Sequence, residues 1–359
     1  ELIDTREYCN EFTNKLTNYG KGNPKFTNLP RKFNVCFVGS KEMYEHPHIN
    51  DIAYLPVINN LGELGWKIEV GGLLTNTLCE FAIPLDAYIP LDKYWEIGEA
   101  ILTTYRDYGY RYNPRTKCRL MYLINDMGID NFREEVAQRY KNKTGLNISN
   151  TNNITNLIPE IWERRDLLGL HKQQNGNNRL GINVPVGRLY VDELKDILNI
   201  CEIYNATNFR ITVEGNIILP DIPNNKIKEI RNNINNLPRL SETPKTIMKN
   251  LVSCTGNQFC GQSKINTKGN AIKFAKILDE KFIFPDNKNI RIHWTGCPNT
   301  CAQIQIADIG LLGKICTDNH GNKFECVDIY NGGDIGQKSV LGTLYKKNVP
   351  INKVLEDEL

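Results

Sequence analysis

Long hydrophobic runs are absent from this chain of 359 residues. No uninterrupted apolar stretch approaches the roughly 18 residues that a membrane helix needs. An apolar content of 40% nevertheless suffices for ordinary cores. The sequence therefore predicts a soluble, globular protein with no membrane partner, and its length allows about two to three domains.

The chain also lacks a large excess of charge of one sign. Lysine and arginine number 44 and aspartate and glutamate 41, which leaves a formal net charge of +3. The basic residues are scattered, and no basic stretch alternates with aromatic residues as it does in single-strand binders. We therefore predict no nucleic-acid partner, although a mildly basic surface would suit an acidic protein. We expect a monomer.

Cysteine is too sparse for a disulfide scaffold. Eleven cysteines make up about 3% of the chain, against roughly 8–10% in disulfide-stabilised domains. Their odd number and mostly irregular spacing are typical of a reducing compartment. Seven are expected to be structural thiols: Cys9, Cys36, Cys79, Cys118, Cys201, Cys316 and Cys326.

The first part of the chain mixes strands and helices. An apolar run predicts a strand over 35–38, and a second strand over 68–74 is interrupted by a Gly-Gly pair that permits close backbone approach. Residues 92–107 and 131–140 are predicted helices, and the Asn-rich stretch 147–155 is the predicted linker. The first helix has a stripe of large apolar residues at helical spacing: Tyr94, Trp95, Ile97, Ile101 and Tyr105.

The middle part predicts a compact unit. Its expected order is strand, helix, strand, strand, helix, which is most of a ferredoxin-like split β-α-β unit. The first helix is expected to bury the apolar residues at positions i, i+3, i+4 and i+7, namely Leu194, Ile197, Leu198 and Cys201. The elements are expected at 181–186, 192–204, 209–213, 217–219 and 225–234.

The last part alternates strands and helices again. It predicts a Gly-containing loop over 254–260, a helix over 269–281, and strands over 290–294 and 306–312. Such alternation favours a mixed α/β layer domain. The sequence as a whole predicts an α+β protein with three parts, residues 1–155, 156–240 and 241–359.

Four cysteines stand in two tight pairs. Cys254 and Cys260 form a C-x5-C pair, and Cys297 and Cys301 form a C-x3-C pair. Thiolates suit soft metals, and four of them match the ligand count of a 4Fe–4S cluster. Two alternatives stay open on spacing alone: buried structural thiols, and a zinc site, whose pairs are usually two to four residues apart.

Two other segments carry polar side chains of interest. Arg31, Lys32 and Asn34 precede the first predicted strand, and composition alone favours a solvated basic pair there. His46 and His48 are interpreted as hydrogen-bonded loop histidines without a chemical role. A Gly-Gly-x-x-Gly stretch at 332–336 lacks the βαβ frame of a nucleotide loop and is interpreted as a site of close backbone approach.

The residues around the four cysteines resemble those of a known family. Residues 254–262 and 293–301 are similar to the two cluster loops of the nitrite and sulfite reductases, and residues 306–310 are most similar to the ferredoxin-dependent nitrite reductases of plants, algae and cyanobacteria. The similarity continues through much of the chain. It covers residues 28–34, 45–54, 70–72, 82–87, 162–165 and 184–189.

This resemblance implies a fold and an activity. The fold would be two mixed α/β sirohaem-binding domains with a ferredoxin-like half-domain between them. The cofactors would be a 4Fe–4S cluster and sirohaem, and the reaction would be the six-electron reduction of nitrite to ammonium in nitrate assimilation, with electrons from reduced ferredoxin.

The resemblance also implies roles for individual residues. Cys254, Cys260, Cys297 and Cys301 would hold the cluster, and Cys301 would bridge it to the sirohaem iron. Lys32 would bind the anion and supply protons, with Arg31 beside it. Asn34 favours nitrite, because sulfite reductases typically carry a second lysine at this position and a monoanion needs the extra cation less. Asn299, between the second pair of ligands, would touch the haem edge.

The sequence departs from the family in two places. The family usually has Gln-Asn where this chain has Gly215-Asn216, so one polar contact near the haem carboxylates is expected to be missing. The chain also begins at Glu1 without an initiator Met or a transit peptide. We therefore expect it to be the C-terminal portion of a longer enzyme, whose site would be the plastid stroma in a photosynthetic eukaryote and the cytoplasm otherwise.

Three alternatives remain at this point. Within the same enzyme class, the protein could be a ferredoxin-dependent sulfite reductase. From another class, it could be a non-enzymatic zinc-binding α/β module. A degenerate chain that keeps the cluster cysteines but binds no sirohaem is the third.

Overall fold

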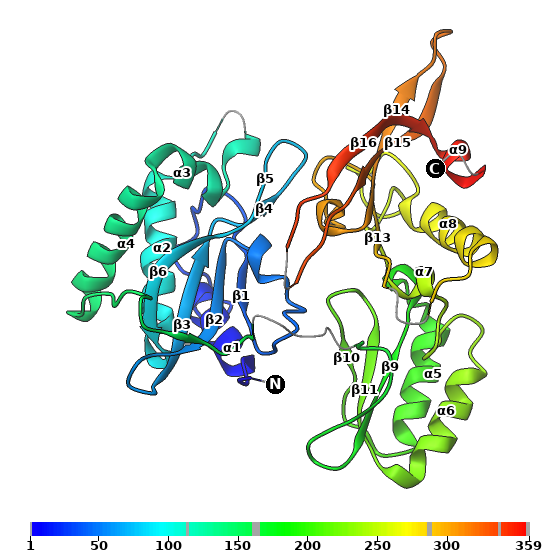
Figure 1. Cartoon of the computed structure of the whole chain (residues 1–359), viewed down its shortest axis with the longest axis horizontal. Coiled ribbons are helices and arrows are strands. Elements are labelled where there is room, and N and C mark those ends of the chain that lie inside the picture. The colour runs from blue at the N-terminus through cyan, green and yellow to red at the C-terminus, as the bar shows by residue number, and fades with distance from the viewer. Residues whose placement is uncertain (1, 113–114, 160–165, 286–288, 337–338, 357–359) are drawn as a thin grey trace. The chain divides into compact units, whose positions relative to one another are not determined.

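The computed structural model describes residues 2–112, 115–159, 166–285, 289–336 and 339–356, and it divides into two compact units, Glu1–Glu163 and Arg164–Leu359 (Figure 1). Residues 162–165, one of the similar stretches, lie outside the described residues. None of the described helices is long and apolar enough to cross a membrane.

The first unit contains a sheet with strand order β1-β2-β3-β6. β1 and β2 are parallel, and the other neighbours are antiparallel. The strands are β1 (Val35–Phe37), β2 (Ile52–Ile58), β3 (Leu64–Val70), β6 (Ile83–Pro90), β7 (Thr155–Asn156, paired with β2), and the separate pair β4 (Leu73–Leu74) and β5 (Cys79–Glu80). The helices are α1 (Arg6–Thr17), α2 (Tyr94–Tyr108), α3 (Leu120–Met127) and α4 (Ile129–Thr144).

An aromatic core holds this unit together. The rings of Phe37 and Tyr54, on the parallel strands, stack with centroids 4.2 Å apart, and Trp66 on β3 meets both edge-on. The predicted stripe of α2 is confirmed, since all five of its residues are buried. The predicted linker is not a free connection, because Ser149 pairs with Tyr88 and the stretch ends in β7.

The second unit contains two sheets. The first is antiparallel, with order β10-β11-β9-β8, and α5 and α6 cover one of its faces (Figure 1). Ile197 and Cys201 of α5 are buried as predicted, but Leu198 is 47% exposed and Ile200 is buried instead, because the buried face of α5 also includes Glu193 and is rotated away from Leu198. The elements are β8 (Gly169–Lys172), β9 (Asn178–Ile182), α5 (Val191–Glu202), β10 (Arg210–Ile211), β11 (Ile217–Ile222) and α6 (Ile227–Asn235).

The other sheet of this unit has order β12-β13-β14-β15-β16. Its first three strands are parallel to one another and its last three antiparallel. The helix α8 connects β12 to β13 and packs on the sheet through Phe274, whose ring meets that of Trp294 edge-on at 5.9 Å. The elements are α7 (Thr246–Lys249), β12 (Leu251–Ser253), α8 (Thr267–Lys281), β13 (Ile292–Thr295), β14 (Ile309–Thr317), β15 (Lys323–Asn331), β16 (Thr343–Pro350) and α9 (Ile351–Glu356).

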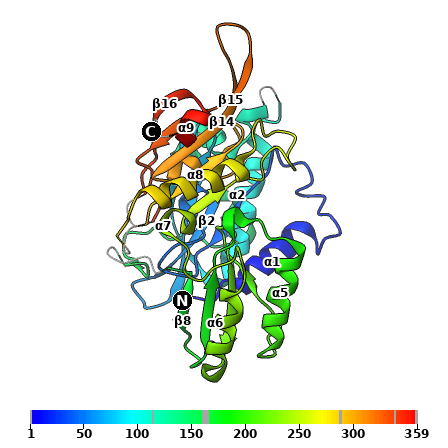
Figure 2. The ribbon, with the colours of Figure 1, turned by 90° about the vertical axis from the view of Figure 1, so that its right-hand side faces the viewer.

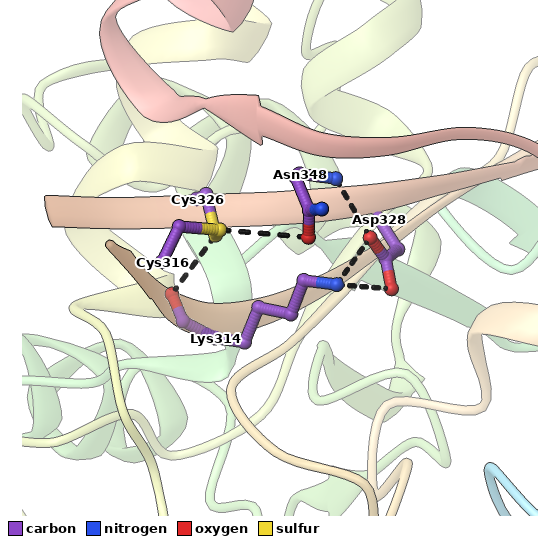
Figure 3. The surroundings of a disulfide bond; sticks show 5 residues. All are labelled: Lys314, Cys316, Cys326, Asp328 and Asn348. Carbon is purple, nitrogen blue, oxygen red and sulfur yellow. Dashed lines mark hydrogen bonds and ion pairs between the residues drawn. A yellow bond between two sulfur atoms is a disulfide. The ribbon is translucent and has the colours of Figure 1, made fainter. Parts of the chain in front are cut away.

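A disulfide corrects one expectation. Cys316 and Cys326, predicted to be thiols, are bonded across the β14–β15 hairpin, which extends beyond its neighbours (Figures 1 and 2). Around them, Lys314 forms an ion pair with Asp328 at 2.7 Å, and Asp328 accepts a hydrogen bond from the backbone N–H of Asn348 on β16 (Figure 3). The register of the β14–β15 hairpin brings these two cysteines together. Their spacing in the sequence, nine residues between them, does not predict that register.

This disulfide predicts a measurable stability difference. Reduction should lower the free energy of unfolding of the second unit by about 2–3 kcal/mol, since the bond closes a short loop in the unfolded chain. Urea unfolding with and without dithiothreitol measures it. A double variant with Cys316→Ser and Cys326→Ser should have the free energy of unfolding of the reduced protein, and dithiothreitol should not change it. Identical curves for the oxidised and reduced wild type would contradict the prediction.

Candidate functional site

The two cysteine pairs follow neighbouring parallel strands. Ser253, the last residue of β12, is in register with Trp294 of β13, so Cys254 and Gly296 both lie just past the carboxyl edge of the sheet. The backbone N–H of Cys254 donates to the carbonyl of Trp294 at 3.0 Å. The carboxyl edge of a parallel sheet is where α/β folds place their ligand-binding loops.

The two loops are in direct contact at Gly296. Its N–H donates to Sγ of Cys254 at 3.3 Å, and its carbonyl accepts from the N–H of Lys264 at 2.8 Å. A side chain is excluded here, because a Cβ on Gly296 would lie 1.9 Å from Oγ of Ser263. The glycine before the second pair therefore lets the C-x3-C turn pack against the C-x5-C loop.

Each loop is held by its own turns. The N–H of Cys260 donates to the carbonyl of Gly256 at 3.0 Å, and Gly256 has a φ of 81°, with Thr267 too close to admit a Cβ. In the second loop, the N–H of Thr300 donates to the carbonyl of Cys297 at 3.2 Å. Cys297 is buried, Cys254 and Cys260 are half-buried, and Cys301 is exposed.

The donor set consists of four thiols on two loops, and thiolates are the ligands of iron–sulfur clusters. All four cysteines are thiols in the structure. Within the described ranges, no group of three or more His, Cys, Asp or Glu side chains is arranged to hold a single metal ion. In a 4Fe–4S cluster the four thiolates lie apart from one another, because each binds a different iron. Hydrogen bonds to sulfur also suit it: besides Gly296, Oγ1 of Thr267 lies 3.5 Å from Sγ of Cys254.

Two cations that sequence reasoning missed lie beside these loops. Nζ of Lys268 donates to the carbonyl of Val186 and, at 3.5 Å, to that of Ser253. Burial lowers the pKa of Lys268 and Arg188 lowers it further, while Cys254 opposes the shift. The guanidinium of Arg188 lies 5.8 Å from the ring centroid of Phe259. Lys268 lies in no motif, and Arg188 lies in the similar stretch 184–189, to which the sequence analysis assigned no role.

The segment 30–34 belongs to the first unit. Lys32 is exposed, and Arg31 is half-buried with Nη1 donating to the carbonyl of Arg115 at 2.8 Å. The backbone of Asn34 makes two hydrogen bonds: its N–H donates to Oδ2 of Asp51 at 2.8 Å, and its carbonyl accepts from Ile52 at 3.1 Å. The segment is thus fixed at the start of the parallel pair, with the lysine side chain outward.

A buried ion pair supports this segment. Asp51 accepts two hydrogen bonds from Arg119, at 2.7 and 3.2 Å, in addition to that from Asn34. Burial raises the pKa of the Asp51 carboxyl, while Arg119, the Asn34 amide and Lys32 oppose the rise. Sequence reasoning missed this pair because its members are 68 residues apart.

The remaining predicted positions are placed as follows. His48 bonds to Glu69 at 2.7 Å, and His46 is buried. Asn299 is exposed on the C-x3-C turn. A Cβ on Gly333 would lie 2.5 Å from the carbonyl oxygen of Gln305, so the glycine stretch is a close approach to the protein's own backbone.

The Gly215-Asn216 departure has a packing reason. A Cβ on Gly215 would lie 2.9 Å from Cα of Gly187, so the turn after β10 leaves no room for the family's glutamine. Asn216 is buried, and its Oδ1 accepts from Nδ2 of Asn183 and from the N–H of Val184, both at 3.0 Å. The asparagine therefore closes this turn onto the end of β9.

Two family models match the chain. The model of the nitrite and sulphite reductase 4Fe-4S domain matches residues 1–144, which include Lys32 and Asn34 but none of the four paired cysteines. The model of the nitrite/sulfite reductase ferredoxin-like half domain matches residues 171–237, which span the antiparallel sheet with α5 and α6.

Individual proteins are similar over nearly the whole chain. The chloroplastic ferredoxin–nitrite reductase of Spinacia oleracea is 42% identical over 98% of the chain and 58% of its own length. That of Synechococcus elongatus is 41% identical over 95% and 64%, and sulfite reductase [ferredoxin] 1 of Mycolicibacterium paratuberculosis 30% over 100% and 62%. The chain thus spans about three fifths of these relatives. The solved NirA protein of Mycobacterium tuberculosis superposes with a TM-score of 0.87 at 27% identity, over 99% of the chain and 63% of NirA.

Proposed function

Because this chain belongs to the nitrite and sulphite reductase family, we propose that it serves the reduction of nitrite to ammonium, with a 4Fe–4S cluster held by Cys254, Cys260, Cys297 and Cys301. The observation that supports the proposal is the contact of the two cysteine loops at Gly296, at the carboxyl edge of one sheet. Reduced ferredoxin is the proposed electron donor.

Nitrite is favoured over sulfite as the substrate. The nitrite reductases compared above are 41–42% identical to the chain, against 30% for the sulfite reductase. Asn34 supports the same choice, because a neutral amide suits a monoanion where a second lysine would suit a dianion. The protein would act in nitrate assimilation as a monomer, in the plastid stroma of a photosynthetic eukaryote or otherwise in the cytoplasm.

The cofactors would supply electrons one at a time and an iron atom to which the substrate binds. The chain's own residues would supply charge and protons. Lys32 would attract the anion and hold a proton near its oxygen atoms, with a strength that grows as water is excluded. Arg31 would reinforce the positive potential while its Nη1 stays bonded to Arg115. Cys301 would be the thiolate shared with the sirohaem iron, and Asn299 would lie at the haem edge.

A substitution of Lys32 tests the proposal. With the chain loaded with iron, sulfide and sirohaem, Lys32→Met should lower kcat/KM for nitrite by about tenfold or more, since each 1.4 kcal/mol of lost transition-state stabilisation costs a factor of about ten. The measurement is ammonium formed with reduced ferredoxin. Lys41→Met, a loss of the same charge at a position without a proposed role, is the control.

Three outcomes would overturn parts of this proposal. Faster turnover of sulfite than of nitrite by the wild type would favour the sulfite reductase alternative. One zinc and no iron in the purified protein would favour the non-enzymatic module. Cluster absorption without sirohaem bands after loading would identify a chain that keeps only the iron–sulfur site.

A further inference from the structure

We propose that Lys268 and Arg188 set the reduction potential of the cluster by offsetting the negative charge that it gains on reduction, an inference that rests on the proposed function. Neither residue is among the proposed ligands. Both belong to the second unit, and each contacts the residue that precedes a proposed ligand cysteine. Lys268 bonds to the carbonyl of Ser253, before Cys254, and Arg188 packs on Phe259, before Cys260.

Lys268 is fixed in place by two parts of the unit. It is the second residue of α8, so it lies at the positive end of a 15-residue helix whose first residue, Thr267, contacts Sγ of Cys254. Its Nζ donates to the carbonyls of Val186 and Ser253. Both acceptors are neutral, so the charge of the ammonium is oriented without being neutralised.

Arg188 approaches from the ferredoxin-like half-domain. The turn that precedes it is unusual, because Val186 is 3% exposed and has a φ of 53°, a left-handed conformation that is rare for a β-branched residue. Val186 packs in the core of the other sheet, with Leu251 of β12. This insertion directs its carbonyl to Lys268 and brings Arg188 over Phe259. A strained backbone conformation of this kind persists only where the surrounding structure holds it in place, which is often the case at functional sites.

The two cations have no acidic counterpart among the described residues. Nη2 of Arg188 is buried and has no hydrogen-bond partner within the described ranges. None of the groups that shift the pKa of Lys268 is a carboxylate: burial and Arg188 lower it, and Cys254 opposes the shift. Two neighbouring like charges repel, which is unfavourable unless a negative group lies close to both. An iron–sulfur cube with four thiolate ligands is such a group, and its net charge is one of the properties that set its potential.

The test is a potentiometric titration of the cluster, followed by electron paramagnetic resonance, on the full chain reconstituted with iron and sulfide. Lys268→Met should lower the equilibrium constant for cluster reduction about tenfold, which is about 59 mV for a one-electron couple. Arg188→Gln should act in the same direction. Lys268→Arg, which keeps the charge, should stay near the wild type.

Lys273→Met is the matched control, because it removes an exposed lysine from the same helix. Equal potentials for Lys268→Met, Arg188→Gln and this control, with full iron content, would overturn the inference and leave the proposed function intact. Failure of the wild type to take up iron would instead overturn the proposed function. A purely structural role would lower the unfolding midpoint without moving the potential, and Arg188→Gln keeps the test open if Lys268→Met does not fold.

Discussion

Replacement of Cys297 by alanine is expected to remove most of the iron that the reconstituted chain binds. The wild type should bind about four iron atoms through four thiolates. Cys297 is 7% exposed and follows the glycine at which the two loops meet, so no other thiol can take its place without opening that contact. The measurement is iron per chain, together with the visible absorption of the cluster.

The control for this variant is Cys201→Ala. Cys201 is a buried thiol in α5 of the same unit, where it packs among aliphatic side chains of the antiparallel sheet. Its loss should weaken packing but leave the iron content near that of the wild type. If Cys297→Ala retained four iron atoms, the assignment of the second pair as ligands would be wrong.

Replacement of Arg119 by methionine is expected to lower the free energy of unfolding of the first unit by about 3–5 kcal/mol, because it leaves Asp51 charged, buried and unpaired. The two side chains are 6% and 1% exposed. The same change should loosen the segment of Lys32 and Asn34, since Asp51 anchors the Asn34 backbone. Urea unfolding of the wild type and the variant measures the difference.

Two further variants separate the buried pair from charge loss in general. Arg6→Met breaks an exposed pair with Asp4 and should cost less than about 1 kcal/mol. Adding Asp51→Asn to Arg119→Met should restore part of the loss, because it removes the uncompensated charge. A cost for Arg119→Met no larger than for Arg6→Met would show that water solvates Asp51 in the variant.

Local patterns predicted the regular elements well where one periodicity dominated. The five apolar residues of α2 are all buried, and the predicted helices over 192–204, 225–234 and 269–281 correspond to α5, α6 and α8. Several strands were missed, among them the buried strand β2 and the longer strands β15 and β16. Whether these segments form strands depends on pairing with neighbouring strands, which the composition of a single segment does not show.

The sequence by itself determined which residues can carry the chemistry: two tight cysteine pairs, each in a glycine-containing turn, and the segment of Lys32 and Asn34. Only the tertiary structure decided what surrounds them. Parallel pairing of β12 and β13 brings the two loops to one sheet edge, and the turn at Val186 delivers Arg188 and orients Lys268 there. The physical reason is that charge and hydrogen bonding act over a few ångströms in space, whatever the separation along the chain.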